Sequence, residues 1–69
     1  MVLILSIETS APICSVALHQ NGILKGIIEV AVDNSHSEVL TVLIENLLKK
    51  TLVDKSQLDA IAVSMGPGS

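Results

Sequence analysis

The stretch ICSVALHQNGILKGIIEV, residues 13–30, decides how this chain folds. Two runs of mainly branched apolar residues flank the dipeptide Asn21-Gly22, which tolerates the positive φ angles of a type I′ turn. The stretch therefore predicts a β-hairpin, with one strand over residues 13–19 and the next from residue 23 to about residue 32. Lys25 and Glu29 are spaced as outward positions of the second strand.

On the N-terminal side of this hairpin lies another branched apolar run, Val2-Leu3-Ile4-Leu5-Ser6-Ile7. Such a run is typical of a central strand that is buried on both faces. Thr9-Ser10-Ala11-Pro12 interrupts it, and Pro12 cannot donate a hydrogen bond to a strand ladder. We therefore expect three consecutive strands joined by short turns, which form an antiparallel meander.

On the C-terminal side the spacing of apolar residues changes to that of a helix. Ser35-His36-Ser37-Glu38 has the pattern of a capping box, and we expect a helix from about His36 to Leu52. Its buried face is predicted to hold Leu40, Leu43, Ile44, Leu47 and Thr51, with Leu48 and Leu52 on the flank. Residues 54–57 resemble a second cap that leads only a short turn, and residues 61–65 indicate a fourth strand.

A helical crossover can return the fourth strand beside the first and parallel to it. The sequence thus predicts an α/β fold, β-β-β-α-β, with a mixed sheet in the order 3-2-1-4. This is the opening half of an RNase H-like or actin-like lobe. Residues 1–69 would form the N-terminal part of that lobe, which is incomplete in this chain.

Composition limits how such a chain can be stabilised. A domain of 69 residues buries only about 60% of the surface that its unfolded form exposes, yet 49% of these residues are hydrophobic. Cys14 is the single cysteine, so no internal disulfide can form, and no Cys/His cluster offers a zinc site. We expect the apolar surface to require a continuation or a partner, and the chain alone to be aggregated, oligomeric or domain-swapped.

Charge and aromatic content argue against direct binding of nucleic acid. The net charge is −3, and the chain has four lysines, no arginine and no aromatic residue. Nucleic-acid affinity rests largely on cations, and binders of single strands add aromatic stacking platforms. The apolar run at residues 2–7 is far shorter than the roughly 20 residues of a membrane span, and it lacks the features of a signal peptide. We therefore expect a cytoplasmic protein without a membrane segment.

Two segments that follow buried strands are candidate ligand sites, because ligands of α/β proteins tend to lie at the C-terminal ends of strands. In Glu8-Thr9-Ser10 a carboxylate and two hydroxyls could orient a hydrated cation or a phosphate; the alternative is a strand end closed by a turn. The segment Gly66-Pro67-Gly68-Ser69 could allow close approach of an anion, or it could be an ordinary tight turn.

The remaining candidates are weaker. His36 has no metal-ligand partner four residues on, His19 carries no signal, and Cys14 lacks a neighbouring cation and is expected to be a small buried hydrophobe. Val39 and Val42 lie off the main apolar stripe of the helix, which suggests a second contact surface; single exposed apolar residues also occur without such a role.

Several of these segments together resemble the start of TsaB proteins. The resemblance is carried in order and spacing by residues 4–10 (ILSIETS), 14–18 (CSVAL), 36–38 (HSE), 58–63 (LDAIAV) and 66–69 (GPGS). It covers essentially the whole chain. The first and last of these motifs are jointly specific, whereas neither alone would be. TsaB-like chains continue past the last motif into a helix and a second lobe, so we expect this chain to be the N-terminal piece.

The resemblance implies an actin-like (ASKHA) fold and a non-catalytic scaffold that pairs with the paralogue TsaD. With the ATPase TsaE, such proteins support threonylcarbamoyladenosine formation beside the anticodon of tRNA. It implies no cofactor in this chain, ATP being used by the partner system, and contact with tRNA only through the complex. A homodimer is a further expectation. The partner contact carried over from the family comprises His36, Val39, Leu40, Val42 and Leu43.

Two other functions compete with the scaffold. An ASKHA-type enzyme, either a TsaD-like transferase or a small-molecule kinase, would place Glu8 near a metal-bound phosphate. The short connection before the helix and the ending Gly-Pro-Gly-Ser differ from the pattern of TsaD, and Thr9-Ser10 differs from the glycines of sugar kinases. Proteolysis, suggested by the older glycoprotease label of the family, ranks last because no nucleophile–base pair is recognisable.

Overall fold

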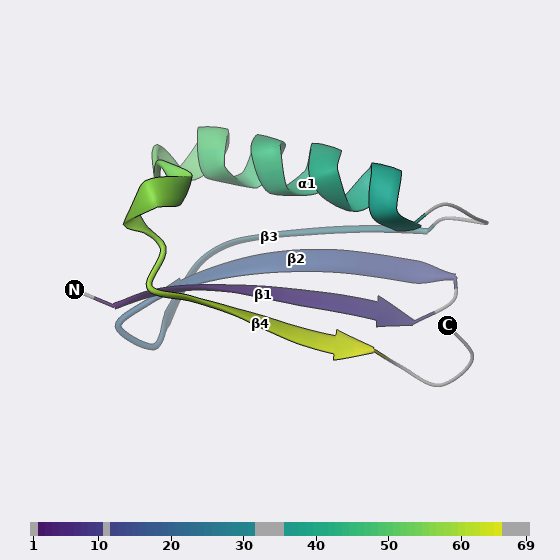
Figure 1. Ribbon diagram of the computed structural model, residues 1–69, viewed down its shortest axis with the longest axis horizontal. Coiled ribbons are helices and arrows are strands. Elements are labelled where there is room, and N and C mark those ends of the chain that lie inside the picture. Colours follow the sequence, from purple (N-terminus) through teal and green to yellow (C-terminus); the bar gives the residue numbers. More distant parts are fainter. Residues whose placement is uncertain (1, 11, 32–35, 66–69) are drawn as a thin grey trace.

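The computed structural model describes residues 2–10, 12–31 and 36–65. It contains the strands β1 (Leu3–Ser10), β2 (Ile13–Gln20) and β3 (Ile23–Ala31), the helix α1 (His36–Thr51), a short 3₁₀ helix η1 (Lys55–Gln57) and the strand β4 (Ala60–Met65). Figure 1 shows two layers, with α1 lying across one face of a single sheet. The β-β-β-α-β order is therefore confirmed.

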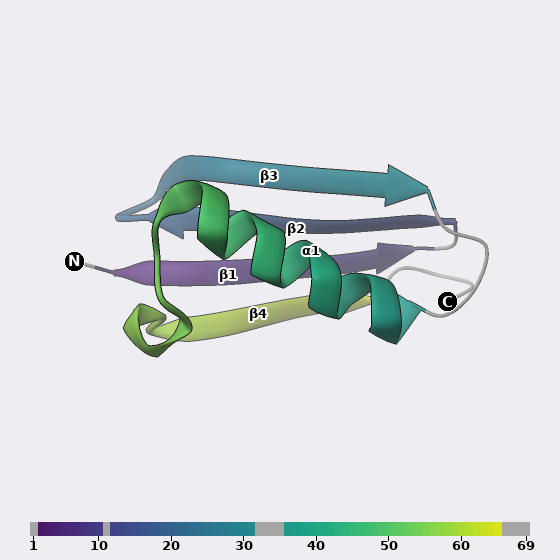
Figure 2. The same cartoon turned by 90° about the horizontal axis from the view of Figure 1, so that it is seen from above.

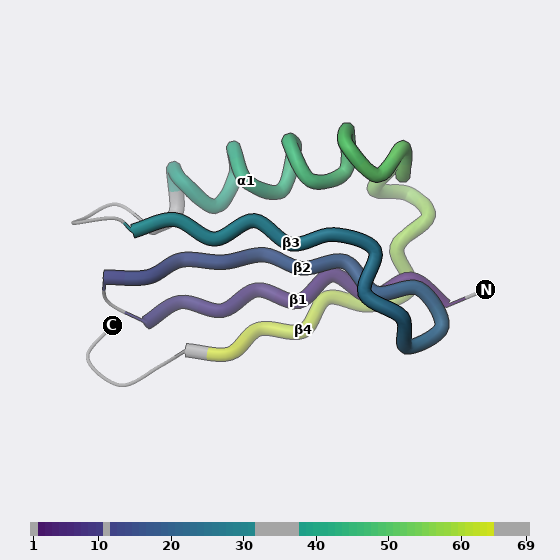
Figure 3. The backbone as a smooth tube through the Cα atoms, turned by 180° about the vertical axis from the view of Figure 1, so that it is seen from behind, coloured from purple at the N-terminus to yellow at the C-terminus, as the bar shows by residue number. Residues whose placement is uncertain are grey.

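The sheet has the predicted order β3-β2-β1-β4. β1 pairs antiparallel with β2, and β2 with β3, whereas β4 pairs parallel with β1. Asn21 and Gly22 have φ angles of 53° and 80°, so the predicted two-residue turn joins β2 to β3. Figure 3 shows this turn at the same end of the sheet as the N-terminus.

One face of the sheet packs against α1. The buried residues of β1 and β2 alternate along each strand, and they meet apolar residues of α1 that recur at helical spacing. Figure 2, seen from above, shows the helix crossing the sheet obliquely. The resulting core consists of Leu3, Leu5, Ile7, Cys14, Val16, Leu18, Leu43 and Leu47.

Strand β3 contains a bulge, and next to the bulge it makes a close contact with α1. The pairing of β2 with β3 shifts between Leu18 and His19, so Lys25 is an extra, exposed residue. Gly26 follows it beneath α1, where an added Cβ would lie 3.0 Å from a terminal methyl of Leu47. The absence of a side chain at Gly26 thus lets α1 approach β3 closely.

Helix α1 ends in a Schellman motif. The N–H of Val53 donates to the carbonyl of Leu48 at 3.0 Å, and that of Leu52 to Lys49 at 3.3 Å. Leu52 adopts a φ of 58° and is 91% exposed, so the prediction that it joins the apolar flank of the helix is wrong. The helix ends at this residue, and the side chain of Leu52 projects into solvent.

The second predicted cap is confirmed at η1. The Asp54 carboxylate accepts hydrogen bonds from the N–H and the hydroxyl of Ser56, and the N–H of Asp54 donates to Gln57 Oε1 at 2.8 Å. This is a capping box that closes the start of η1. The other predicted capping box depends on Ser35, which lies outside the described residues.

Two side chains anchor the start of β1. Asp59 Oδ2 accepts a hydrogen bond from the N–H of Leu3 at 2.7 Å, while the N–H of Asp59 donates to the carbonyl of Leu3 at 2.8 Å. Asn21 forms the same type of reciprocal pair with Val2. The N–H of Val2 donates to Asn21 Oδ1 at 2.8 Å, and the N–H of Asn21 donates to the carbonyl of Val2 at 2.8 Å. The entry to β1 is thereby held on both sides, by the hairpin turn and by the segment that leads into β4.

No helix in residues 2–10, 12–31 and 36–65 has the length and apolar character needed to cross a membrane.

Candidate functional site

The segment Glu8-Thr9-Ser10 lies within β1, whereas the sequence had predicted a loop. β1 continues to Ser10 because each of these residues pairs with a residue of β2. Thr9 is 8% exposed and lies on the face that α1 covers, while Glu8 and Ser10 are exposed on the opposite face. The three side chains therefore do not converge on one ligand, and binding by this segment remains a prediction.

On the uncovered face, strand pairing places Glu8 in a row of polar residues that sequence reasoning missed. Glu8 pairs with Ser64 of β4 on one side and with Ser15 of β2 on the other, and Ser15 pairs with Glu29 of β3. The short connection between Ser10 and Ile13 was the signal that could have placed Ser15 beside Glu8, whereas the β3 bulge and the return of β4 decide where Glu29 and Ser64 lie. The row offers hydroxyls and carboxylates as hydrogen-bond acceptors on the uncovered face of the sheet.

The second predicted site, Gly66-Pro67-Gly68-Ser69, lies outside the described residues. The strand before it ends beside the first candidate segment, because Met65 of β4 pairs with Thr9 of β1. Figure 1 shows the arrowheads of these two parallel strands at the same end of the sheet. In the described part of the chain, no group of three or more His, Cys, Asp or Glu residues is placed to hold a metal ion.

The residues predicted to contact a partner are divided between the core and the surface of α1. Val42 is 54% exposed, whereas Leu43 is 6% exposed and belongs to the core. Val39 and Leu40 are half-buried and pack against that core, so Val39 lies closer to the apolar stripe than predicted. The side chain of His36 lies outside the described part. Of these residues, only Val42 presents a largely exposed apolar side chain.

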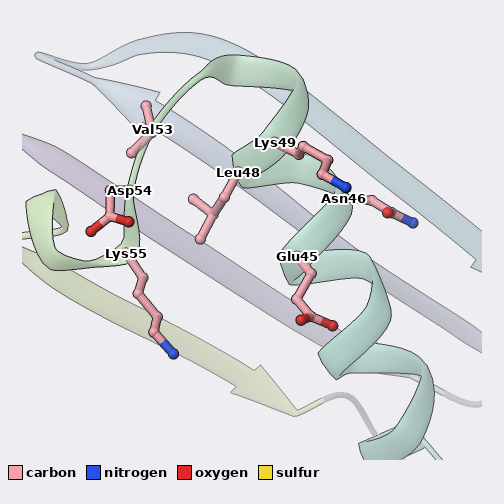
Figure 4. Close-up of a pocket in the computed structure, with 7 residues that line it drawn as sticks. All are labelled: Glu45, Asn46, Leu48, Lys49, Val53, Asp54 and Lys55. Carbon is pink, nitrogen blue, oxygen red and sulfur yellow. The ribbon is translucent and has the colours of Figure 1, made fainter.

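Sequence reasoning also missed a hollow between α1 and η1. Its volume is about 420 Å³, and Figure 4 shows the residues that line it: Glu45, Asn46, Leu48, Lys49, Val53, Asp54 and Lys55. Leu48 and Val53 supply apolar surface, and the charged side chains are of both signs. The hydrogen bonds from the Ser56 hydroxyl and N–H lower the pKa of Asp54. Its carboxylate is thus kept ionised and engaged in the cap.

Cys14 and His19 do not add to a site. Cys14 has no exposed surface, and burial raises the pKa of its thiol, which agrees with the prediction of a buried hydrophobe. His19 is half-buried on the uncovered face of the sheet, where it pairs with Ile4 and Leu24.

Similarity to known proteins covers nearly all of the chain. Residues 13–69 match the family described as TsaD, tRNA N6-adenosine threonylcarbamoyltransferase. The tRNA N6-adenosine threonylcarbamoyltransferase of Pediococcus pentosaceus is 39% identical over 82 residues, which cover 96% of this chain and 24% of that protein. The tRNA threonylcarbamoyladenosine biosynthesis protein TsaB of Buchnera aphidicola is 39% identical over 67 residues, which cover 96% of this chain and 29% of that protein.

The fold agrees with these matches. YeaZ from Pseudomonas aeruginosa superposes with a TM-score of 0.87 at 33% identity, covering 100% of this chain and 32% of that structure. The chain spans about a quarter to a third of the length of these relatives. On the family match and the likeness to TsaB and YeaZ over almost the whole sequence, the chain belongs to the TsaD family and is of the TsaB type.

Proposed function

We propose that this chain serves in threonylcarbamoyladenosine biosynthesis as part of a non-catalytic scaffold that pairs with a TsaD-type transferase. The observation that carries the proposal is the length of the two alignments. The alignment with the Pediococcus transferase extends over 82 positions although the chain has 69 residues, so at least 13 positions have no counterpart here. The alignment with TsaB extends over 67 positions and needs no such insertion.

The spacing of the elements supports the same choice. β3 ends at Ala31 and α1 begins at His36, so the connection that is longer in the catalytic paralogue comprises residues 32–35 here. This short connection is the feature of the chain that favours the scaffold over the transferase. ATP would be used by a TsaE-like ATPase of the complex.

The outer surface of α1 is the proposed contact with the transferase. Val42 provides an exposed apolar centre, with the exposed carboxylates of Glu38 and Glu45 on the same helix. An apolar centre with a charged rim is the usual anatomy of a protein interface. The tRNA would be reached only through the complex, because the chain has a net charge of −3 and no arginine or aromatic residue.

A second candidate is a transferase of the TsaD type. It is favoured by the description of the matched family and by the name of the Pediococcus relative. The two candidates differ in one respect that can be measured: a transferase acts on the threonylcarbamoyl group itself, whereas a scaffold acts only when TsaD is present.

An omission assay separates them. Transfer of threonylcarbamoyl to tRNA is measured with TsaC, TsaD, TsaE and ATP, with and without the protein that contains this chain. The scaffold predicts that transfer requires this protein and that none occurs when TsaD is left out. Transfer without TsaD would establish the enzyme instead, and undiminished transfer without this protein in the presence of TsaD would overturn the scaffold.

A pair of variants tests the proposed surface. Val42→Lys places a charge at the apolar centre, and it should reduce both TsaD binding and transfer at least about tenfold. Ile23→Lys is the control, because Ile23 is 67% exposed on β3 and lies outside that surface. The placement of the interface on α1 would be contradicted if both variants lost TsaD binding and transfer equally, or if neither variant lost them.

A further inference from the structure

The side chains on the covered face of β3 change in size along the strand. Ile28 and Val30 pack against the core, whereas Gly26, the residue of this face nearer the start of the strand, has no side chain. Gly26 pairs with Leu18 of β2, which is fully buried beneath α1. Figure 2 shows the C-terminal end of α1 over β3 and its N-terminal end toward β4. The position without a side chain therefore lies beneath the last turns of the helix.

Two side chains of α1 fill the space over Gly26. An added Cβ would lie 3.0 Å from Leu47 Cδ1 and 3.2 Å from Thr51 Cγ2, whereas ordinary van der Waals contacts begin at 3.4 Å. Leu47 is 2% exposed and enclosed by the core. Thr51 Oγ1 donates to the carbonyl of Leu47 at 2.8 Å, which fixes the direction of the Thr51 methyl. Since neither side chain moves aside easily, a larger residue at position 26 would displace the helix.

Space, and not backbone conformation, requires the glycine here. Among the described glycines a positive φ occurs at Gly22, and Gly26 has a φ that other residues also adopt. Glycine weakens the interior of a strand relative to residues with side chains, and in strands it often marks the close approach of another part of the chain. At Gly26 the part that approaches is α1.

We propose that Gly26 is a positioning residue for the contact with the transferase, an inference that rests on the proposed function of α1. The close contact at Gly26 fixes where α1 lies on the sheet, and the same helix carries Val42, which is 54% exposed, on its outer surface. Val42 and Leu47 are five residues apart, about 7.5 Å along the axis. Helices are rigid and protein interiors are close-packed, so a displacement at Leu47 also moves Val42. Interfaces match their partners in shape, and such a displacement weakens binding.

Binding of TsaD to the protein that contains this chain, measured by titration calorimetry, tests the inference. Gly26→Ala should raise the dissociation constant at least about threefold, and Gly26→Val at least about tenfold, because the displacement grows with the side chain. Thr51→Ser removes the methyl and keeps the hydroxyl that donates to Leu47. The double variant Gly26→Ala with Thr51→Ser should therefore return the constant to within about twofold of the parent.

Two controls separate positioning from a general loss of stability. Asp59→Ala removes the hydrogen bond at the start of β1 and lies outside the contact between β3 and α1. It should lower stability but change the dissociation constant by less than about 1.5-fold. Residual dipolar couplings should show α1 reoriented relative to the strands in Gly26→Ala and restored in the double variant with Thr51→Ser. Circular dichroism should show that every variant is folded.

The inference would be overturned if Gly26→Val bound TsaD as the parent does, or if Asp59→Ala lost as much binding as Gly26→Ala. It would also be overturned if Thr51→Ser restored neither the binding nor the orientation of α1. Val42→Lys distinguishes this failure from failure of the proposed function. If Val42→Lys loses binding while Gly26→Val keeps it, the inference alone is wrong. If Val42→Lys keeps binding, the interface does not lie on α1 and both are wrong.

Discussion

The backbone at Leu52 predicts that this residue can be replaced by glycine with a gain in stability. Leu52 ends α1 with a φ of 58°, a conformation that costs an ordinary L-residue roughly 1–2 kcal/mol. Glycine avoids this cost, although its greater freedom in the unfolded chain removes roughly 0.5–1 kcal/mol of the benefit. The side chain of Leu52 is 91% exposed, so almost no buried surface is lost. We expect Leu52→Gly to raise the free energy of unfolding by about 0.5–1 kcal/mol.

Two companion variants separate the backbone from the side chain. Leu52→Ala removes most of the side chain but keeps the Cβ that clashes in this conformation, so stability should change by less than about 0.3 kcal/mol. Leu52→Val should be less stable than the parent, because β-branched residues are strongly disfavoured at positive φ.

Urea unfolding followed by circular dichroism, at protein concentrations low enough to avoid association, measures this series. The glycine variant should unfold at the highest urea concentration, the parent and the alanine variant at a lower and similar one, and the valine variant at the lowest. The slope of the free energy of unfolding against urea concentration should be the same in all four proteins. The reasoning would be refuted if Leu52→Gly were less stable than the parent. It would also be refuted if Leu52→Ala gained as much as Leu52→Gly, because the side chain and not the backbone would then decide the result.

Three other predictions follow from the packing and the caps. Leu47→Ala removes a side chain that is 2% exposed and should lower the free energy of unfolding by about 2–5 kcal/mol, out of a total near 3–10 kcal/mol for a chain of this size. In the same urea titrations, the control Val42→Ala should lower it by less than about 0.5 kcal/mol. Asp59→Ala removes the carboxylate that accepts the hydrogen bond from the N–H of Leu3, and it should lower the free energy of unfolding by about 1–3 kcal/mol in a urea titration. The amide hydrogen of Leu3 should also exchange faster with solvent. Unchanged exchange would contradict the role of Asp59 as an anchor of β1. The folded state lowers the pKa of Asp54, so the ionised cap stabilises the fold. This stabilisation is fully present at pH values above the usual carboxyl pKa of about 3.9, and it is lost as the pH falls through the lower pKa of the folded state. Carbon NMR should place its midpoint below that usual value, and Ser56→Ala should return it upward.

The sheet could be predicted from the sequence because its signals are local. Asn21-Gly22 specifies a two-residue turn, and that turn sets the pairing of β2 with β3 as far as the bulge at Lys25. The apolar stripe of α1 is equally local, and Leu43 and Leu47 are buried as expected. The parallel return of β4 beside β1 followed from the length of the crossover helix.

The predictions that were wrong concern residues whose exposure depends on which part of the fold covers them. Glu8 and Ser10 looked like a loop because they are polar, but they face the uncovered side of the sheet while Thr9 faces the helix. Leu52 looked like part of the apolar stripe, yet the Schellman motif turns the chain there, and no glycine marks the position. The candidate site was predicted as the segment Glu8-Thr9-Ser10, and the neighbours of Glu8 in the sheet, Ser15 and Ser64, were missed because they come from other strands.

The pairing of β1 on both sides has a consequence for synthesis on the ribosome. One side of β1 pairs with β2, and only two residues separate these strands. The other side pairs with β4, which begins 50 residues after Ser10. At the usual 5–20 residues per second, that second edge stays open for roughly 3–10 s. During this time Leu5 and Ile7 lie on a nascent strand with a vacant side. A chaperone that binds nascent chains has its clearest target there, and slower translation of residues 11–59 would lengthen its opportunity.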